Sequence, residues 1–132
     1  MPYVHIVLAL ALVEFFLFSL AVARARATYN VPAPATTGHE VFERYFRVQM
    51  NTLEQLMIFV PSLLLFARYV NAWLAAALGL AFIIGRALYF RAYVRAAAER
   101  HFGFMLSVIP NVTLLAGSLL GALWALIRYR SG

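Results

Sequence analysis

Apolar residues fill four long stretches of this chain of 132 residues, and short polar or basic segments separate them. The pattern predicts helices over about residues 4–26, 40–69, 73–100 and 104–128. About 20 residues at a rise of 1.5 Å cross a hydrocarbon core of roughly 30 Å, so each helix is long enough to span a membrane. We therefore expect an all-α integral membrane protein, a four-helix bundle in which residues 1–132 form a single domain.

The second helix gathers its polar residues on one face. At about 100° per residue, Glu43, Arg47, Asn51 and Glu54 fall within roughly 80° of one another. Charge inside a membrane is costly unless it is paired or binds something, so we interpret this stripe as one wall of a ligand pocket. The alternative is a structural network, in which Glu54 neutralises Arg47 or Arg86 between helices.

The third helix has a similar polar face, whose members fall within roughly 60° of one another: Arg86, Tyr89, Tyr93 and Arg100. A very short turn at 70–72 should make the second and third helices antiparallel, which brings the two polar faces to the same end of the bundle. Guanidinium groups suit carboxylates, Glu54 suits an ammonium group, and tyrosine hydroxyls orient polar atoms. The combined set predicts a pocket for a small zwitterion with more than one carboxylate.

The composition narrows the possible chemistry. The chain is 64% hydrophobic and 12% charged, with 11 basic residues, all arginine, against 5 acidic ones. It has no cysteine, which excludes disulfides and thiolate metal sites, so any reacting thiol must come from a substrate. The histidines at 5, 39 and 101 lack metal-ligand spacing, and we expect no metal. The basic balance favours membrane lipid headgroups or a small anionic ligand, and not nucleic acid.

Two motifs carry a resemblance to a known family. They are RxxxNxxE at 47–54, preceded by Phe42-Glu43-Arg44, and RxxYFxxY at 86–93. With the connector at 34–38, they resemble the membrane-associated proteins in eicosanoid and glutathione metabolism, the MAPEG family, which includes the microsomal glutathione transferases and leukotriene C4 synthase. The resemblance implies a homotrimer in which glutathione is a co-substrate at each subunit interface.

The same resemblance implies roles for individual residues. Those that would hold glutathione within one subunit are Arg47, Asn51, Glu54, Tyr89 and Tyr93. Arg86, on the same face as the two tyrosines, belongs to this set. Those that would reach it from the neighbouring subunit are Arg26, Gln49 and Arg100. Arg100 matches the arginine that stabilises the thiolate, and we assign it the catalytic role.

Two positions depart from the leukotriene synthase pattern. Gln55 stands where a tyrosine is usual, and Ala27 stands where a second loop arginine is usual. The second change removes a candidate proton donor, which argues against conjugation of leukotriene A4. The resemblance therefore favours a membrane transferase or peroxidase that activates the glutathione thiol for attack on lipophilic electrophiles or lipid hydroperoxides, as in detoxification.

Two alternatives stay open. One is a lipid-binding protein of the same fold without turnover. The other is a small proton-coupled multidrug transporter, because Glu14 is a lone carboxylate in the first helix. An interhelical hydrogen bond explains Glu14 more simply, and a transporter would leave both polar faces without a purpose.

Arginine distribution and small residues predict how the bundle is placed and packed. Most arginines lie at the end that carries the connector of residues 30–39, so both termini should be outside and the active-site loops cytoplasmic. Gly117 and Gly121 are four apart in the fourth helix, a spacing that lets membrane helices approach closely.

Overall fold

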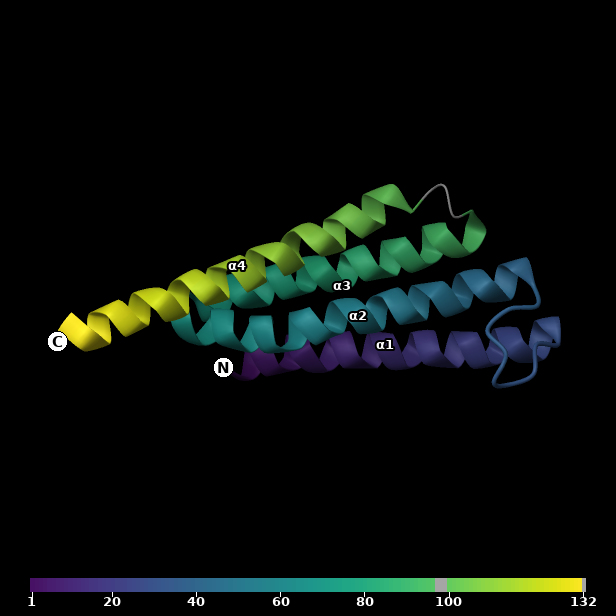
Figure 1. Ribbon diagram of the computed structural model, residues 1–132, viewed down its shortest axis with the longest axis horizontal. Coiled ribbons are helices and arrows are strands. Elements are labelled where there is room, and N and C mark those ends of the chain that lie inside the picture. Colours follow the sequence, from purple (N-terminus) through teal and green to yellow (C-terminus); the bar gives the residue numbers. More distant parts are fainter. Residues whose placement is uncertain (97–99, 132) are drawn as a thin grey trace.

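The computed structural model describes residues 1–96 and 100–131, most of which lie in four long helices (Figure 1). These are α1 (Pro2–Tyr29), α2 (Glu40–Tyr69), α3 (Ala72–Arg95) and α4 (His101–Ser131). All four are long and apolar enough to cross a membrane. The predicted all-α, four-helix membrane architecture is confirmed.

Local chemistry explains where the helices begin. The imidazole Nδ1 of His39 accepts a hydrogen bond from Val41 N at 3.1 Å, which caps the start of α2. Asn71 Oδ1 accepts one from Leu74 N at 2.8 Å and caps α3 in the same way. Such side chains satisfy backbone donors that have no partner within the helix.

One predicted boundary was wrong. The sequence predicted a third helix that continues to Arg100, but α3 ends at Arg95, and the backbone of Ala96 is extended, with φ −160°. Arg100 instead precedes α4, where its carbonyl accepts a hydrogen bond from Phe104 N at 3.0 Å. Arg100 therefore does not share a helix face with Tyr89 and Tyr93, and its position depends on how α4 packs.

The helices form an elongated bundle. Both termini lie toward one end, and the segment that joins α1 to α2, the end of α3 and the start of α4 lie at the other, which we call the connector end (Figure 1). α2 and α3 pack together, and both α1 and α4 pack on this pair. Residues near 30, 40, 95 and 101 therefore meet at the connector end, although they are far apart in sequence.

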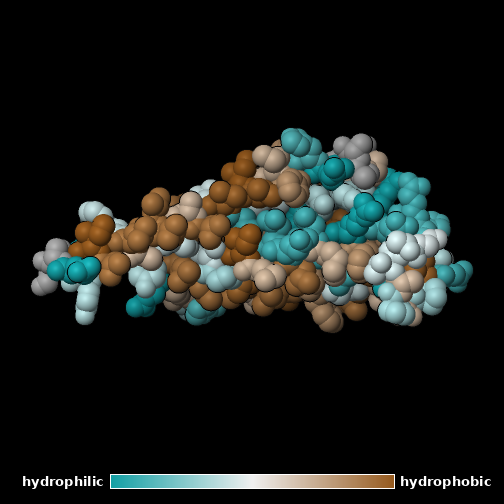
Figure 2. Space-filling model, in the orientation of Figure 1, coloured by the Kyte–Doolittle hydropathy of each residue, from teal (hydrophilic) through white to brown (hydrophobic). Residues whose placement is uncertain are grey.

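The bundle is apolar inside and outside. Phe59 of α2 stacks on Phe82 of α3, with ring centroids 4.1 Å apart, in a core that includes Leu63 and Leu114. Large apolar side chains such as Phe16 of α1 and Leu120 of α4 are exposed, as in a helix that faces lipid. Figure 2 shows a hydrophilic surface at the connector end that extends as a band toward the middle of the bundle, with hydrophobic surface around it.

Glycines allow α4 to approach its neighbours. A Cβ added at Gly103 would lie 2.3 Å from the backbone N of Tyr89, and one at Gly85 would lie 2.5 Å from the backbone N of Ser107. The backbones of α3 and α4 are therefore in near contact at the connector end. The close approach predicted at Gly117 and Gly121 is confirmed, since added Cβ atoms there would lie 2.3 Å from the side chain of Phe66 in α2 and 2.9 Å from that of Val70, the residue after α2.

Candidate functional site

A pocket of about 470 Å³ opens at the connector end of the bundle. Its lining residues are Asn51, Tyr89, Arg100, His101 and Phe104. Asn51 comes from α2, Tyr89 from α3, and the other three from the start of α4 and the residue before it. The fold thus brings together three of the residues that the sequence assigned to a ligand pocket, and it draws them from three separate elements.

Arg86 lies behind this pocket and is fully buried, with 0% of its surface exposed. Its Nη1 donates a hydrogen bond to Asn51 Oδ1 at 2.7 Å. Its guanidinium carbon lies 4.4 Å from the centroid of the Tyr89 ring, a cation–π contact that stabilises charge in an apolar setting. Its Nε and Nη2 donors have no hydrogen-bond partner among the described residues. Arg86 therefore supports the pocket from behind by contacting two of its lining side chains, those of Asn51 and Tyr89.

Aromatic rings form one wall of the site. Tyr89 and Tyr93 are both buried, with ring centroids 5.4 Å apart. Phe104 packs against Tyr89 at 5.8 Å. The guanidinium carbon of Arg100 lies 5.7 Å from the centroid of Tyr93. The cationic end of Arg100 is thus held over an aromatic surface at the edge of the pocket.

The polar stripe of α2 divides between two environments. Asn51 is half-buried and lines the pocket, whereas Arg47 and Glu54 are exposed on the bundle surface. In the part of the chain that the structure describes, Glu54 forms no ion pair with Arg47 or Arg86. The neutralised network considered as the alternative is therefore not formed among the described residues of this chain. Glu43 has a separate role, since its Oε2 accepts a hydrogen bond from Gly38 N at 3.3 Å.

Two predicted site residues make contacts elsewhere in the chain. Arg26 Nη1 donates to the carbonyl of Ala35 at 2.7 Å, and its guanidinium lies 4.9 Å from the centroid of Phe42. Gln49 Nε2 donates to Ser19 Oγ at 2.8 Å. Neither residue lines the pocket. Arg26 folds the connector against the start of α2, and Gln49 joins α2 to α1.

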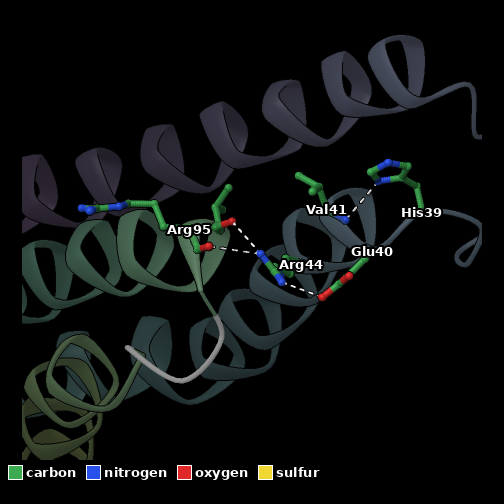
Figure 3. Close-up of polar contacts among 6 residues, drawn as sticks. His39, Glu40, Val41, Arg44 and Arg95 are labelled. Carbon is green, nitrogen blue, oxygen red and sulfur yellow. Dashed lines mark hydrogen bonds and ion pairs between the residues drawn. The ribbon is translucent and has the colours of Figure 1, made fainter.

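An arginine fixes the end of α3 beside the site (Figure 3). Arg44 Nη1 donates to the carbonyl of Arg95 at 3.1 Å, and its Nη2 forms an ion pair with Glu40 at 2.7 Å. The last carbonyls of a helix lack partners within the helix and carry partial negative charge, which a guanidinium stabilises. Arg44 thus ties the start of α2 to the end of α3, from which the chain continues toward Arg100.

The sequence prediction missed two pocket residues. His101 was considered only as a metal ligand, and Phe104 was not singled out, yet both line the pocket. Helical spacing could have identified both residues only if the start of α4 had been predicted correctly. Residues 101 and 104 are three apart and share a helix face once α4 begins at His101. Within the described residues, no group of three or more His, Asp or Glu side chains could hold a metal ion.

Four membrane-spanning helices and a polar pocket among three of them define a multi-pass integral membrane protein with a site at one end of its bundle. Residues 4–120 match the sequence model of the MAPEG family. The chain belongs to this family.

Relatives extend the comparison. An uncharacterized protein of Synechocystis is 47% identical over 121 residues, which cover 92% of this chain and 88% of that protein. Microsomal glutathione S-transferase 2 of Homo sapiens is 46% identical over 100 residues, covering 74% of this chain and 68% of the human protein. Leukotriene C4 synthase of Rattus norvegicus is 39% identical over 83 residues, covering 63% of this chain and 55% of the rat protein.

Proposed function

We propose that this protein is a membrane glutathione transferase. Glutathione would bind in the pocket at the connector end, and its thiol would attack a lipophilic electrophile or a lipid hydroperoxide. The observation that carries the proposal is the convergence of Asn51, Tyr89 and Arg100 from three elements around one polar pocket of an apolar bundle. Two of the relatives above are named for glutathione transfer and leukotriene C4 synthesis.

The chemistry of the site suits glutathione. A volume of about 470 Å³ lies within the usual range of small-molecule pockets. The tripeptide carries two carboxylates, an ammonium group and a thiol, which call for cationic, anionic and neutral polar partners. Arg100 offers a guanidinium at the pocket, and Asn51 offers an amide. Holding the thiol beside a fixed cation favours its thiolate form, which is the nucleophile.

The exposed pair on α2 supports a homotrimer as part of this proposal. Arg47 and Glu54 lie on a helix that is long and apolar enough to span the membrane, yet they have no ion-pair partner within the described residues. Charged groups at membrane depth are costly unless another molecule satisfies them. A neighbouring copy would enclose glutathione between subunits and bring Arg26 and Gln49, as the resemblance implies, whereas Arg100 lines the pocket of the same chain. Native mass spectrometry of the detergent-solubilised protein tests this, and a monomer would contradict it.

Orientation follows from the arginines. Arg44, Arg95 and Arg100 lie at the connector end, so we propose that this end faces the cytoplasm, from which glutathione enters. The apolar outer faces of the bundle would deliver the second substrate from the bilayer. Because the chain has no cysteine, a single Thr36→Cys variant can be labelled in intact cells with a membrane-impermeant maleimide. Labelling before lysis would contradict the cytoplasmic placement.

Glutathione should raise an ultraviolet thiolate band when it is added to the purified protein in detergent. S-methylglutathione, which has no ionisable thiol, should bind without this band and serves as the control. Binding of glutathione without a thiolate band would favour the lipid-binding alternative that lacks turnover. Failure to bind glutathione would overturn the proposed function.

Replacing Arg47 with alanine should raise the KM for glutathione by roughly 10-fold to 100-fold, the worth of one hydrogen bond to a charged group. The KM for a lipophilic electrophile such as chlorodinitrobenzene should change little, because that substrate has no carboxylate. Arg91→Ala is the matched control, since Arg91 is also an exposed arginine but belongs to α3 and not to the polar stripe of α2. Equal effects of the two substitutions would mean that Arg47 contributes only general surface charge.

A further inference from the structure

Glu14 of α1 lies at the level of Arg86 of α3. The two helices run in the same direction (Figure 1). Val7 packs against Gly79, where an added Cβ would lie 2.6 Å from Val7 Cγ1, and Phe18 stacks on Phe90 with ring centroids 4.6 Å apart. Both contacting pairs differ by 72 in residue number. Glu14 and Arg86 differ by the same 72 positions and lie between these two contacts, one turn before the stacked rings.

Arg86 is a buried cation whose hydrogen bonds are incomplete. It has no exposed surface, and only its Nη1 has a hydrogen-bond partner, Asn51, within the described residues. A buried charge without a counter-charge strongly destabilises a fold. Glu14 is half-buried and, in the described part of the chain, forms no hydrogen bond and no ion pair within 4.0 Å. It is the carboxylate that the register of α1 on α3 places at the level of this guanidinium.

The hydrogen bond between Arg86 and Asn51 determines which group of the Asn51 amide faces the pocket. The Oδ1 of Asn51 accepts from Arg86, so the amide Nδ2 is the group left to donate into the pocket. An N–H donor at that place suits a carboxylate or carbonyl oxygen of a ligand. If Arg86 shifted, the amide could rotate by half a turn and present an acceptor instead.

We infer that Glu14 is a positioning residue of the site. Its carboxylate holds the Arg86 guanidinium between α1 and α2, and Arg86 in turn fixes the Asn51 amide as a donor toward glutathione. This inference rests on the proposed function, because it assigns Asn51 to glutathione. It also gives Glu14 a purpose other than proton exchange in a transporter.

A double-mutant cycle with Glu14→Gln and Arg86→Met tests the inference. Glu14→Gln should raise the KM for glutathione by roughly fivefold to tenfold, while kcat and the KM for chlorodinitrobenzene stay within about twofold. Glu14→Asp should restore part of the affinity. The double variant should be no worse than Arg86→Met alone, since removing both charges leaves none unpaired. His5→Gln is the control, a substitution of an exposed polar residue in the same helix.

Additive effects of Glu14→Gln and Arg86→Met on both the KM and the thermal midpoint would overturn the inference. So would an unchanged KM in Glu14→Gln, which is the result that a transporter carboxylate predicts. If Arg86→Met does not fold, the cycle is run with Asn51→Ala, in which Glu14→Gln should have no further effect on the KM.

Thermal unfolding without glutathione separates the positioning role of Glu14 from the proposed function. If the two substitutions change the thermal midpoint non-additively but the protein does not bind glutathione, the proposed function and the positioning role are both overturned. The result would then support only a stabilising interaction between the charges of Glu14 and Arg86.

Discussion

Replacing Arg100 with alanine should abolish the thiolate band of bound glutathione and lower kcat/KM by roughly 100-fold to 1,000-fold, as loss of one preorganised charge-stabilising group does in other enzymes. Arg100 lines the pocket, and its guanidinium is held 5.7 Å from the centroid of the buried Tyr93 ring. Lowering a thiol pKa from about 8.5 to about 6.5 requires roughly 2.7 kcal/mol of preference for the anion. One guanidinium in a partly dry pocket can supply this amount.

Two further variants test whether the effect of Arg100→Ala comes from the guanidinium at this position. Arg100→Lys keeps the charge but loses the planar fork, so it should retain a weakened thiolate band. Arg130→Ala removes an arginine from the last turn of α4, far along the helix from the pocket, and should behave as the parent protein. A thiolate band of parental strength in Arg100→Ala would show that another group stabilises the anion.

Replacing Gly103 with alanine should destabilise the bundle by about 2–4 kcal/mol, a large effect for one methyl group. The added Cβ would lie 2.3 Å from the backbone N and 2.7 Å from the Cα of Tyr89. Backbone atoms cannot turn away as a flexible side chain can, so α4 must move off α3. Thermal unfolding in detergent measures the loss, and glutathione binding should weaken as well because Tyr89 lines the pocket.

Gly121→Ala is the matched control for this prediction. It adds the same methyl group to the same helix, but the nearest atoms there are side-chain atoms of Val70 and Tyr69, at 2.9 and 3.0 Å. Rotation of the Val70 side chain relieves the closest of these contacts, and the Cβ and carbonyl oxygen of Tyr69, at 3.0 and 3.3 Å, need to give by only a few tenths of an ångström, so the cost is lower. Equal losses of stability in the two variants would mean that the backbone contact at Gly103 does not determine the packing of α4 on α3.

The end of α3 shows what sequence reasoning could not reach. The residues that follow Arg95 include three further alanines, which have high helix propensity, so the local sequence favours a longer helix. A guanidinium from the start of α2 instead binds the carbonyl of Arg95. That contact forms only when α2 and α3 lie side by side. The place of Arg100 in turn depends on how α4 packs on α3, which is also a tertiary contact.

The polar stripe of α2 shows the same limit. Helical periodicity correctly placed Asn51 close to Arg47 and Glu54 on one side of the helix. An arc of roughly 80° is wide enough, however, for its members to meet different neighbours. The rotation of α2 against α3 turns Asn51 toward Arg86 and leaves Arg47 and Glu54 on the surface.

The sequence by itself determined the membrane class, the four spanning helices and the grouping of Arg86, Tyr89 and Tyr93 on one face of α3, because hydrophobic length and helical period are local properties of a chain. It also supplied the motifs that resemble the MAPEG family. Only the tertiary structure decided which polar residues share a pocket, which glycines touch a neighbouring backbone, and which amide accepts from the buried Arg86. These depend on helix rotation and register, which are set by contacts between residues that are distant in sequence.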